Sequence, residues 1–130
     1  LKTYSGGLGF LAGSHMKSAF ELRQNLIGVG VLWKYGYYDQ VRQTDNAMGV
    51  QFREKMYWFL QDTGLEFTVG LLGREVRVRA YFLPPETFQT VPLFFLTTDI
   101  DGNDAEARSL SYRLYDNDER LKIAQCALLG

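Results

Sequence analysis

The first quarter of the chain carries apolar residues at three- and four-residue spacing, with Leu8, Leu11 and Met16 as members of the stripe. This spacing places side chains on one face of a helix. The pattern therefore predicts a helix over about residues 8–23, with its apolar face in the core. Gly13 interrupts the stripe at a cost of about 1 kcal/mol relative to alanine, which predicts close packing against a neighbouring backbone.

A continuous apolar run follows at residues 26–33, where the sequence reads Leu-Ile-Gly-Val-Gly-Val-Leu-Trp. Its length and its β-branched residues predict a strand that is buried on both faces. Gly28 and Gly30 within the run indicate that another backbone or a ligand comes close to it. With the preceding helix, this strand makes a βα-type unit.

The middle of the chain changes pattern three times. Residues 34–51 combine tyrosines with polar residues, which predicts an excursion over the surface. Residues 52–60 have apolar positions at helical spacing and predict a helix that ends at Gly64. Residues 66–72 and 75–83 flank a Gly-Arg turn, and the second of these runs alternates strictly between apolar and polar positions, which predicts a half-exposed β-hairpin.

The last third predicts one more strand and two helices. Two consecutive prolines end the hairpin, because proline cannot donate to a ladder. An apolar strand is expected at residues 91–98, and helices are expected near residues 105–115 and 118–129. The side chains suited to cap these helices are Asp104 for the first and Asn117 or Asp118 for the second.

These elements predict a mixed α/β fold in a single unit over residues 1–130, in which apolar strands alternate with helices and the antiparallel hairpin is an insertion. The 46% hydrophobic content is sufficient for one core. The chain begins at Leu1 and ends at Gly130 directly behind an apolar helical run, so we expect it to be a piece of a longer protein.

Charge and composition restrict the partners. Fourteen basic and fifteen acidic residues give a formal net charge of −1, so there is no overall electrostatic case for nucleic acid or an anionic membrane. No apolar run approaches the roughly 18 to 20 residues that a membrane span needs. A single cysteine and a single histidine cannot form a Cys/His zinc cluster, so no metal is predicted. The cysteine usage is typical of a cytoplasmic protein.

A glycine-rich loop precedes the first helix and has the physical properties of an anion site. Glycines let backbone N–H groups approach a phosphate without obstruction by Cβ atoms, and the helix adds the positive end of its dipole. A tight structural turn is the alternative interpretation. The residues of this loop are Ser5, Gly6, Gly7, Leu8 and Gly9.

Other candidate groups favour structural interpretations. The run of residues 99–104 has alternating oxygen side chains, but its glycine is misplaced for a calcium loop and Leu110 stands where a bidentate glutamate is needed, so a capped turn is favoured. His15 has no visible partner for acid–base chemistry and is interpreted as a residue at the edge of the core. Cys126, on an apolar helix, is interpreted as inert packing.

Two further groups could take part in binding. Arg77 and Arg79 alternate on a predicted strand next to Arg74, and a solvated hairpin face is favoured over a phosphate-binding surface. Five aromatic residues could stack on sugars or bases, although aromatic residues of a compact domain usually form core or interface. These aromatic residues are Tyr35, Tyr37, Tyr38, Tyr57 and Trp58.

Several motifs together resemble the glycogen or α-glucan phosphorylase family, in its short bacterial and archaeal branch. The resemblance spans nearly the whole chain in the family's order. The first motifs are Tyr4-Ser-Gly-Gly-Leu-Gly-Phe-Leu-Ala-Gly13, His15-Met-Lys-Ser-Ala19 and Gly28-Val-Gly-Val-Leu-Trp-Lys-Tyr-Gly-Tyr-Tyr-Asp-Gln40. The later ones are Pro92-Leu-Phe-Phe-Leu-Thr-Thr-Asp-Ile100, Arg113-Leu-Tyr115 and Glu119-Arg-Leu-Lys-Ile-Ala-Gln125.

The resemblance implies a glycosyltransferase of the GT-B type, with this chain as part of its Rossmann-like N-terminal domain. Members cleave α-1,4-glucans with inorganic phosphate, reversibly releasing α-D-glucose 1-phosphate, with pyridoxal phosphate as cofactor. The cofactor's lysine belongs to the other domain, so the chain alone is expected to be inactive. The parent is expected to be a cytoplasmic homo-oligomer.

The resemblance also implies roles for two segments. The glycine loop, represented by Gly6, Gly7, Leu8 and Gly9, is expected to face the substrate phosphate and the transferred glucose. The loop before the last helix, with Asp116, Asn117 and Asp118, and with Arg120 behind it, is expected to form a gate at the active-site entrance. No catalytic residue is assigned within the chain.

Three departures from the family pattern limit how far the family's residue roles apply to this chain. Ser14 stands where close relatives often have aspartate, no tryptophan follows Gln40 in the stretch at residues 41–51, and the gate segment is shorter than in the animal enzymes. Two alternatives stay open: a glycogen or starch synthase-like glycosyltransferase, and a carbohydrate-binding module without catalysis. A dinucleotide-binding oxidoreductase is disfavoured, because the loop lacks the Gly-x-Gly-x-x-Gly spacing.

Overall fold

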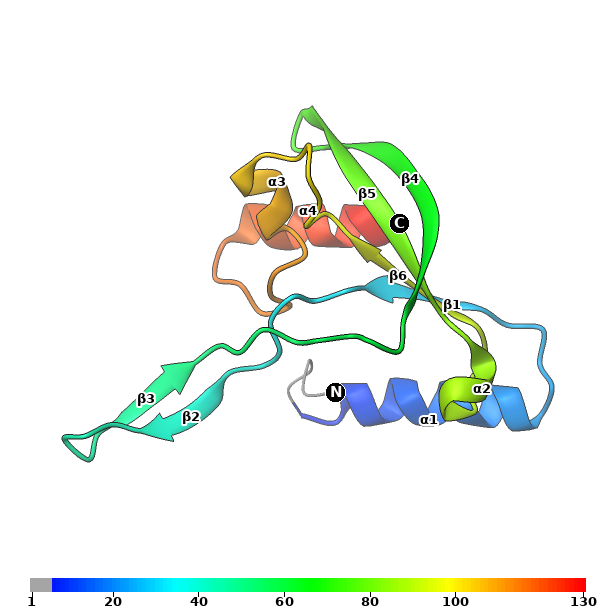
Figure 1. Cartoon of the computed structure of the whole chain (residues 1–130), viewed down its shortest axis with the longest axis horizontal. Coiled ribbons are helices and arrows are strands. Elements are labelled where there is room, and N and C mark those ends of the chain that lie inside the picture. The colour runs from blue at the N-terminus through cyan, green and yellow to red at the C-terminus, as the bar shows by residue number, and fades with distance from the viewer. Residues whose placement is uncertain (1–5) are drawn as a thin grey trace.

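The fold is a mixed α/β arrangement built around a four-stranded sheet, in a computed structural model that describes residues 6–130 (Figure 1). The strands are β1 (Gly28–Val31), β2 (Asp39–Arg42), β3 (Met48–Gln51), β4 (Gln61–Leu71), β5 (Arg74–Leu83) and β6 (Leu93–Thr97). The helices are α1 (Leu8–Glu21), α2 (Pro85–Phe88), α3 (Ala105–Ser109) and α4 (Glu119–Leu129). Among these described helices, none is long and apolar enough to cross a membrane.

The main sheet has the strand order β1-β6-β5-β4. β1 and β6 are parallel, whereas the pairs β6–β5 and β5–β4 are antiparallel. β2 and β3 form a separate antiparallel hairpin that projects from the body as an arm (Figure 1). The α/β prediction is confirmed, and the Rossmann-like assignment stays a prediction.

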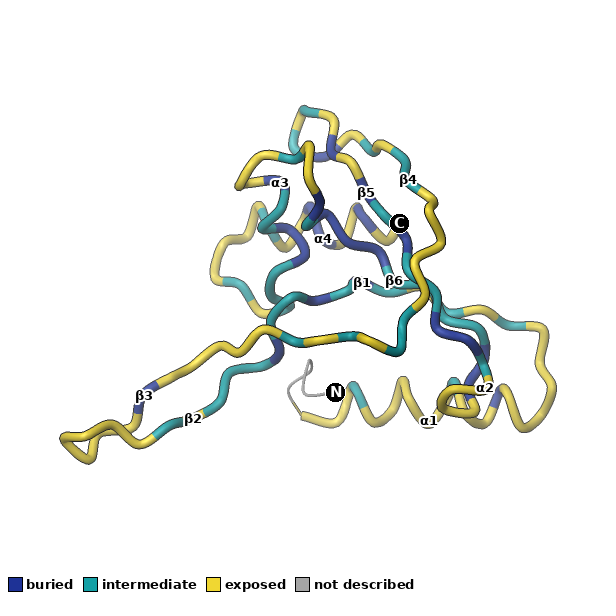
Figure 2. The backbone as a smooth tube through the Cα atoms, viewed as in Figure 1, coloured by how far each residue is buried: buried dark blue, intermediate teal, exposed yellow. Residues whose placement is uncertain are grey.

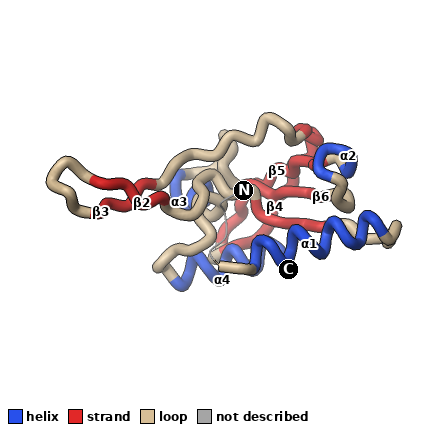
Figure 3. The backbone as a smooth tube through the Cα atoms, turned by 90° about the horizontal axis from the view of Figure 1, so that it is seen from below, coloured by secondary structure: helices blue, strands red, loops and turns tan. Residues whose placement is uncertain are grey.

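The core lies on one face of the main sheet, beneath α3 and α4. Val76, Val78 and Ala80 of β5 supply its centre, and the two helices bring Ala107 and Leu128 against them. Figure 2 shows buried backbone concentrated on β5, β6 and the inner side of α4. Seen from below, α4 runs along one side of the strands and α2 lies on the other (Figure 3).

α1 forms where the apolar spacing predicts it, but most of its apolar stripe is exposed. Within α1 only Ala19 is buried, whereas Leu8 and Leu11 are 62% and 68% exposed. The expected close packing at Gly13 is also wrong: apart from its neighbours in the same turn of α1, no atom of the described residues lies within 4 Å of the position that a methyl group would take there. A main-chain hydrogen bond of 3.2 Å from Val91 N–H to the Met16 carbonyl ties α1 to the segment that leads into β6.

β1 is shorter than the apolar run suggested, and it is an edge strand. Val31 is buried but Val29 is 55% exposed, so the prediction of a strand buried on both faces is wrong for its first half. Gly28 does have a close neighbour, but it is a side chain in place of the backbone or ligand that the run predicts. A Cβ there would overlap a methyl carbon of Leu93, so a side chain would displace the neighbouring strand's leucine.

The predicted helix over residues 52–60 is absent. This segment runs in an extended and turning path, and it is held to the chain that follows β1. Lys55 N–H donates to the Lys34 carbonyl at 2.8 Å, and the Tyr57 hydroxyl donates to the Trp33 carbonyl at 2.6 Å. Because these long-range hydrogen bonds engage the segment's polar groups, they override the local helical spacing.

The β4–β5 hairpin is confirmed, and it forms half of the main sheet where an insertion was expected. Leu72 and Gly73 both have positive φ, as a two-residue turn of type I′ requires. Gly64, predicted to stop a helix, lies within β4 with φ +68°, where the register shifts between Asp62 and Glu66. Glycine adopts this left-handed conformation without steric cost.

The two C-terminal helices are confirmed, with both expected aspartate caps. Asp104 accepts from Ala107 N–H at 2.8 Å, and Asp118 accepts from Arg120 N–H at 2.8 Å. α3 ends at Ser109, six residues before the predicted end. The carbonyls beyond it bind tertiary donors in place of helical N–H groups: Leu110 and Arg113 accept from Gln125, Ser111 from Lys34 N–H, and Tyr112 from Tyr35 N–H.

Candidate functional site

The glycine loop opens α1 with its backbone accessible. Gly6 has φ +67°, and Gly7 is the N-cap residue, with no side-chain hydrogen bond to cap the helix. Leu11 N–H makes the helix's first main-chain bond, of 3.0 Å, to the Gly7 carbonyl, so the N–H groups before Leu11 have no partner within the helix. Apart from their own chain neighbours and the adjoining helix backbone, no atom of the described residues lies within 4 Å of a Cβ built on Gly6 or Gly7. Ser5 lies outside the described residues.

A groove runs beside this loop, between α1 and the β1 edge of the sheet. Its volume is about 450 Å³, and the residues lining it include Gly6 and Gly9 at one end and Thr90 on the sheet side. Small residues along α1, including Ala12, leave room above the glycines of β1. The loop and the groove are therefore continuous, and both are open.

The predicted gate residues Asp116 and Asn117 lie in the loop between α3 and α4, and Arg120 lies in the first turn of α4. Asp116 accepts from Asp118 N–H at 3.1 Å and lies 3.8 Å from the Arg113 guanidinium. Asn117 and Arg120 are exposed. The Arg113 end of this loop is therefore anchored by an ion pair, while the following residues project outward.

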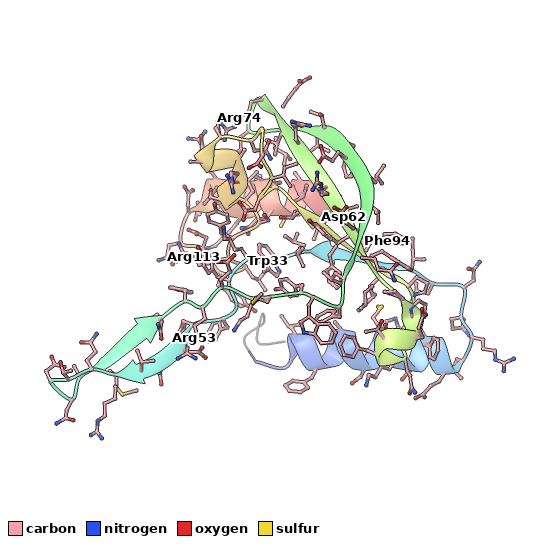
Figure 4. All side chains as sticks on the ribbon, in the orientation of Figure 1. Trp33, Arg53, Asp62, Arg74, Phe94 and Arg113 are labelled. Carbon is pink, nitrogen blue, oxygen red and sulfur yellow. The ribbon has the colours of Figure 1, made fainter. Side chains whose placement is uncertain are left out.

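An aromatic cavity of about 350 Å³ lies at the base of the gate. The Arg113 guanidinium stacks over the Phe52 ring at 4.7 Å, and the Tyr37 ring meets the Tyr115 ring edge to face at 5.8 Å. Tyr38 completes the aromatic wall. Figure 4 shows Arg113 pointing into the region between the β2–β3 arm and the body. The glycine loop lines a different cavity, so the structure does not bring the loop and the gate together in one pocket of the described chain.

An ion-pair cluster that sequence reasoning missed joins the ends of β1 and β6. Lys34 Nζ lies 2.8 Å from Asp99 Oδ2, and Arg108 Nε donates to Asp99 Oδ1 at 2.7 Å. Burial acts to raise the pKa of Asp99, but the hydrogen bonds from Lys34 and Arg108 outweigh it and lower the pKa below its ordinary value. The hydrogen bond between Lys34 and Asp99 also raises the pKa of Lys34 above its ordinary value.

The position of this cluster follows from topology. Lys34 and Asp99 each come two to three residues after a strand, and β1 and β6 are parallel, so their carboxyl ends meet at one edge of the sheet. Ligands of α/β sheets commonly bind at this edge. Here both charges are satisfied within the protein, which indicates a structural clamp.

The remaining predicted groups are placed as follows. Arg74 pairs with Asp104 at 2.6 Å at the tip of the β4–β5 hairpin (Figure 4), and Arg77 and Arg79 both pair with Glu66. This agrees with a solvated, ion-paired hairpin face. Among the other aromatic candidates, Tyr57 is half-buried and burial raises its pKa to about 12, whereas Trp58 is 87% exposed.

Two single-residue interpretations change. His15 is exposed on α1, so it does not lie at the edge of the core. Cys126 is exposed on α4, so the interpretation of inert buried packing is wrong. Within residues 6–130, no three His, Cys, Asp or Glu side chains gather as a metal-binding group.

Comparison with known proteins gives relatives that match the chain along its whole length. It is 49% identical over 130 residues to an uncharacterized protein of Methanocaldococcus jannaschii, of which it covers 25%. It is 35% identical to the glycogen phosphorylase of Mycobacterium tuberculosis and 33% identical to the maltodextrin phosphorylase of Thermococcus litoralis, and it covers 16% of each. No protein-family model matches the chain.

The chain thus spans a sixth to a quarter of the length of these relatives. It is similar to proteins named as phosphorylases from its first residue to its last, in agreement with the resemblance drawn from the motifs. The relatives therefore favour a phosphorylase-related chain.

Proposed function

We propose that this chain is part of an α-glucan phosphorylase that releases α-D-glucose 1-phosphate from α-1,4-glucans and inorganic phosphate. In this proposal the chain belongs to a Rossmann-like N-terminal domain of a GT-B glycosyltransferase. The observation that carries it is the similarity of the whole of this chain to part of a glycogen phosphorylase and part of a maltodextrin phosphorylase. The open glycine loop at the start of α1 adds a physical reason for it.

The loop's part in the reaction is to hold a phosphate. N–H groups of the first turn of α1 lack helical partners, and the positive end of the helix dipole lies at the same place. A phosphate dianion accepts hydrogen bonds from such groups without side-chain rearrangement. Charge that develops on the phosphate is then stabilised by dipoles already in position, the type of interaction whose loss usually costs most in catalysis. Gly6, Gly7, Leu8 and Gly9 form this wall.

In this proposal, Gly6 and Gly7 are needed for different physical reasons. Gly6 has a positive φ that a residue with a Cβ adopts only with strain. Gly7 has φ −88°, so its requirement is steric: a methyl group there would occupy the space in which the anion is expected. The two glycines therefore serve different ends, one conformational and one spatial.

Pyridoxal phosphate is the cofactor expected of the parent protein. When bound, it supplies a phosphate group for proton exchange with the substrate phosphate. The N–H groups of the glycine loop fit a site next to such phosphates. Lys34 is paired with Asp99, and no described lysine lines the groove beside the glycine loop or the aromatic cavity. The attachment lysine is therefore assigned to the rest of the protein.

The gate at Asp116, Asn117 and Arg120 is proposed to control access of the glucan. The Arg113–Asp116 ion pair anchors its first residue beside the aromatic cavity. Because Asn117 and Arg120 project outward, they can move without breaking a buried contact. Glucan, phosphate and glucose 1-phosphate are then the partners of the parent, which is proposed to be a cytoplasmic homo-oligomer.

The test is an assay of the full-length protein with maltodextrin and inorganic phosphate. The proposal expects glucose 1-phosphate as the product and bound pyridoxal phosphate in the purified protein. Transfer of glucose from a nucleotide sugar, without phosphorolysis, would favour the synthase-like alternative. Binding of maltooligosaccharides with neither reaction would favour a non-catalytic module. Either result would refute the phosphorylase assignment.

A further inference from the structure

The β2–β3 arm rejoins the body at Phe52, the residue that directly follows β3. At the base of the arm, the ladder ends with the pair Asp39 and Gln51. Beyond Phe52, an isolated β-bridge joins Glu54 to Tyr35. Phe52 therefore lies between two backbone attachments. A two-stranded hairpin is only marginally stable by itself in water, so these attachments fix the Phe52 ring relative to the body.

The Phe52 ring meets Arg113, a residue of the loop between α3 and α4. The Arg113 guanidinium lies 4.7 Å from the centre of this ring, within the range of a cation–π contact. The same guanidinium lies 3.8 Å from a carboxylate oxygen of Asp116, the first gate residue. One side chain thus connects the arm to the gate. Because the Arg113 side chain is long and 42% exposed, the ring and the carboxylate restrict its position.

The main chain of Arg113 is held from the side of α4. The buried Gln125 side chain donates to the Arg113 carbonyl at 2.9 Å and to the Leu110 carbonyl at 3.0 Å. Buried hydrogen bonds of this kind are costly to break. The backbone at Arg113 is therefore a fixed point, and the direction of its side chain is what can change. Phe52 supplies the face against which that side chain rests.

A row of aromatic rings makes a second connection between the arm and the gate. The Phe52 ring meets the Tyr38 ring edge to face at 6.5 Å, and Tyr38 lies 4.3 Å from Tyr37. Tyr37 in turn meets Tyr115 edge to face at 5.8 Å. Aromatic pairs favour such arrangements. Both connections start at Phe52, and they end at neighbouring residues, Tyr115 and Asp116.

We propose that Phe52 is a positioning residue for the gate. Its ring holds the Arg113 guanidinium next to Asp116, and this favours one arrangement of the gate residues at the glucan entrance. Without the ring, other arrangements become more populated, and a glucan that requires the favoured arrangement binds more weakly. Phosphate binding is expected to be unaffected, because the glycine loop lines a different cavity. The inference rests on the proposed function, which takes Asp116, Asn117 and Arg120 as the gate.

Steady-state phosphorolysis by the full-length protein tests this role with a matched pair of variants. Phe52→Leu keeps an apolar side chain but removes the aromatic face, whereas Phe52→Tyr keeps that face. An exposed cation–π contact corresponds to a change of about twofold to fivefold in an equilibrium constant. Phe52→Leu is therefore expected to raise the KM for maltodextrin by about this factor and to leave the KM for phosphate unchanged. Phe52→Tyr should match wild type.

Three results of these kinetics would overturn the proposal. One is an equal KM for maltodextrin in Phe52→Leu and Phe52→Tyr. Another is a lower kcat in Phe52→Leu with both KM values unchanged, because a purely structural role reduces the amount of active protein without changing its affinity for glucan. The third comes from the control Val50→Ala, at an exposed apolar residue of β3 that should tolerate the change. An equal rise in KM there would show that any disturbance of the arm suffices.

A double-mutant cycle with Arg113→Met tests whether Phe52 acts through Arg113. If it does, the double variant raises the KM for maltodextrin by less than the product of the two single rises. A rise equal to the full product would show that the two residues act independently, and it would overturn the proposal.

Hydrogen exchange of residues 114–120 in the full-length protein gives a readout that needs no activity. Asp118 N–H donates to Asp116 at 3.1 Å, so displacement of Asp116 should release this amide. Exchange in this segment is expected to be about twofold to fivefold faster in Phe52→Leu than in Phe52→Tyr. Equal exchange would overturn the proposal. Faster exchange in a protein that releases no glucose 1-phosphate would refute the proposed function and leave the positioning of this loop by Phe52 supported.

Discussion

The two ends of the main sheet differ in how completely they are covered. At the β4–β5 end, α3 and α4 bury Val76, Val78 and Leu110 to 1% exposure or less. At the β1 end, most residues of α1 are exposed (Figure 2), and the groove of about 450 Å³ beside α1 is open. The covered end holds the fold together, and the open end carries the glycine loop. We therefore expect residues at the covered end to contribute to stability, and residues at the open end to contribute to binding of a ligand or a partner.

The largest effect that tests this contrast is expected at Leu110. Leu110→Ala should lower the free energy of unfolding by about 2–5 kcal/mol, because it removes a fully buried side chain from a packed core. Phe10→Ala in α1 is the matched control and should change it by about 0.5 kcal/mol or less. Urea unfolding of the chain measures both. An equal loss of unfolding free energy in the two variants would contradict the difference between the covered and the open end of the sheet.

The next effect concerns the clamp between β1 and β6. Asp99→Asn should cost about 2 kcal/mol near neutral pH, since two charged donors lose their carboxylate. The pKa of Asp99 is lowered in the folded state, so its contribution is present above the ordinary value of 3.8 and is lost as the pH falls through the folded-state pKa.

The stability gap between wild type and Asp99→Asn should therefore close in acid. Unfolding experiments across a pH series from neutral to strongly acidic conditions measure this gap. Asp101→Asn is the control, because that side chain is fully exposed. A gap that stayed constant with pH would show that the charge of Asp99 is not the source of its contribution.

A smaller effect is expected at the turn that follows β6. The Asn103 side chain accepts from Arg77 N–H at 3.0 Å and donates to the Arg77 carbonyl at 2.7 Å, so it extends the ladder of β5 beyond the end of β6. Asn103→Ala should cost about 1 kcal/mol, as water can replace part of these exposed bonds. Asn25→Ala serves as the control, because Asn25 is an exposed asparagine in the loop between α1 and β1. Equal stability of the two variants would contradict this role of Asn103.

The sequence predicted correctly those elements that depend on residues close together in the chain. Alternation and turn residues predicted the β4–β5 hairpin, and the aspartates at residues 104 and 118 predicted two helix starts. Helical spacing failed over residues 52–60 because Lys55 N–H and the Tyr57 hydroxyl donate to distant carbonyls. It failed after Ser109 because distant donors bind the carbonyls there. Such contacts depend on the tertiary fold, which the spacing of apolar residues does not encode.

The candidate site was predictable to a similar extent. The glycine loop was found from the conformational freedom of glycine, and the structure places it at the open start of α1. The Lys34–Asp99 pair was missed because it requires knowledge that β1 and β6 are parallel neighbours. The exposure of the α1 stripe was also missed, because periodicity identifies a face without identifying what covers it.

The most direct test of the central claim is the phosphate dependence of Gly7→Ala in the full-length protein. Gly7 has open space around it among the described residues and an ordinary φ, so the substitution leaves the fold undisturbed. In the proposed site, its methyl group would displace the phosphate. We predict that kcat/KM for phosphate falls on the order of 100-fold. Gly70→Ala, on an equally open glycine of β4, should match wild type. Equal phosphate kinetics for Gly7→Ala and wild type would contradict the assignment of the glycine loop to the phosphate site.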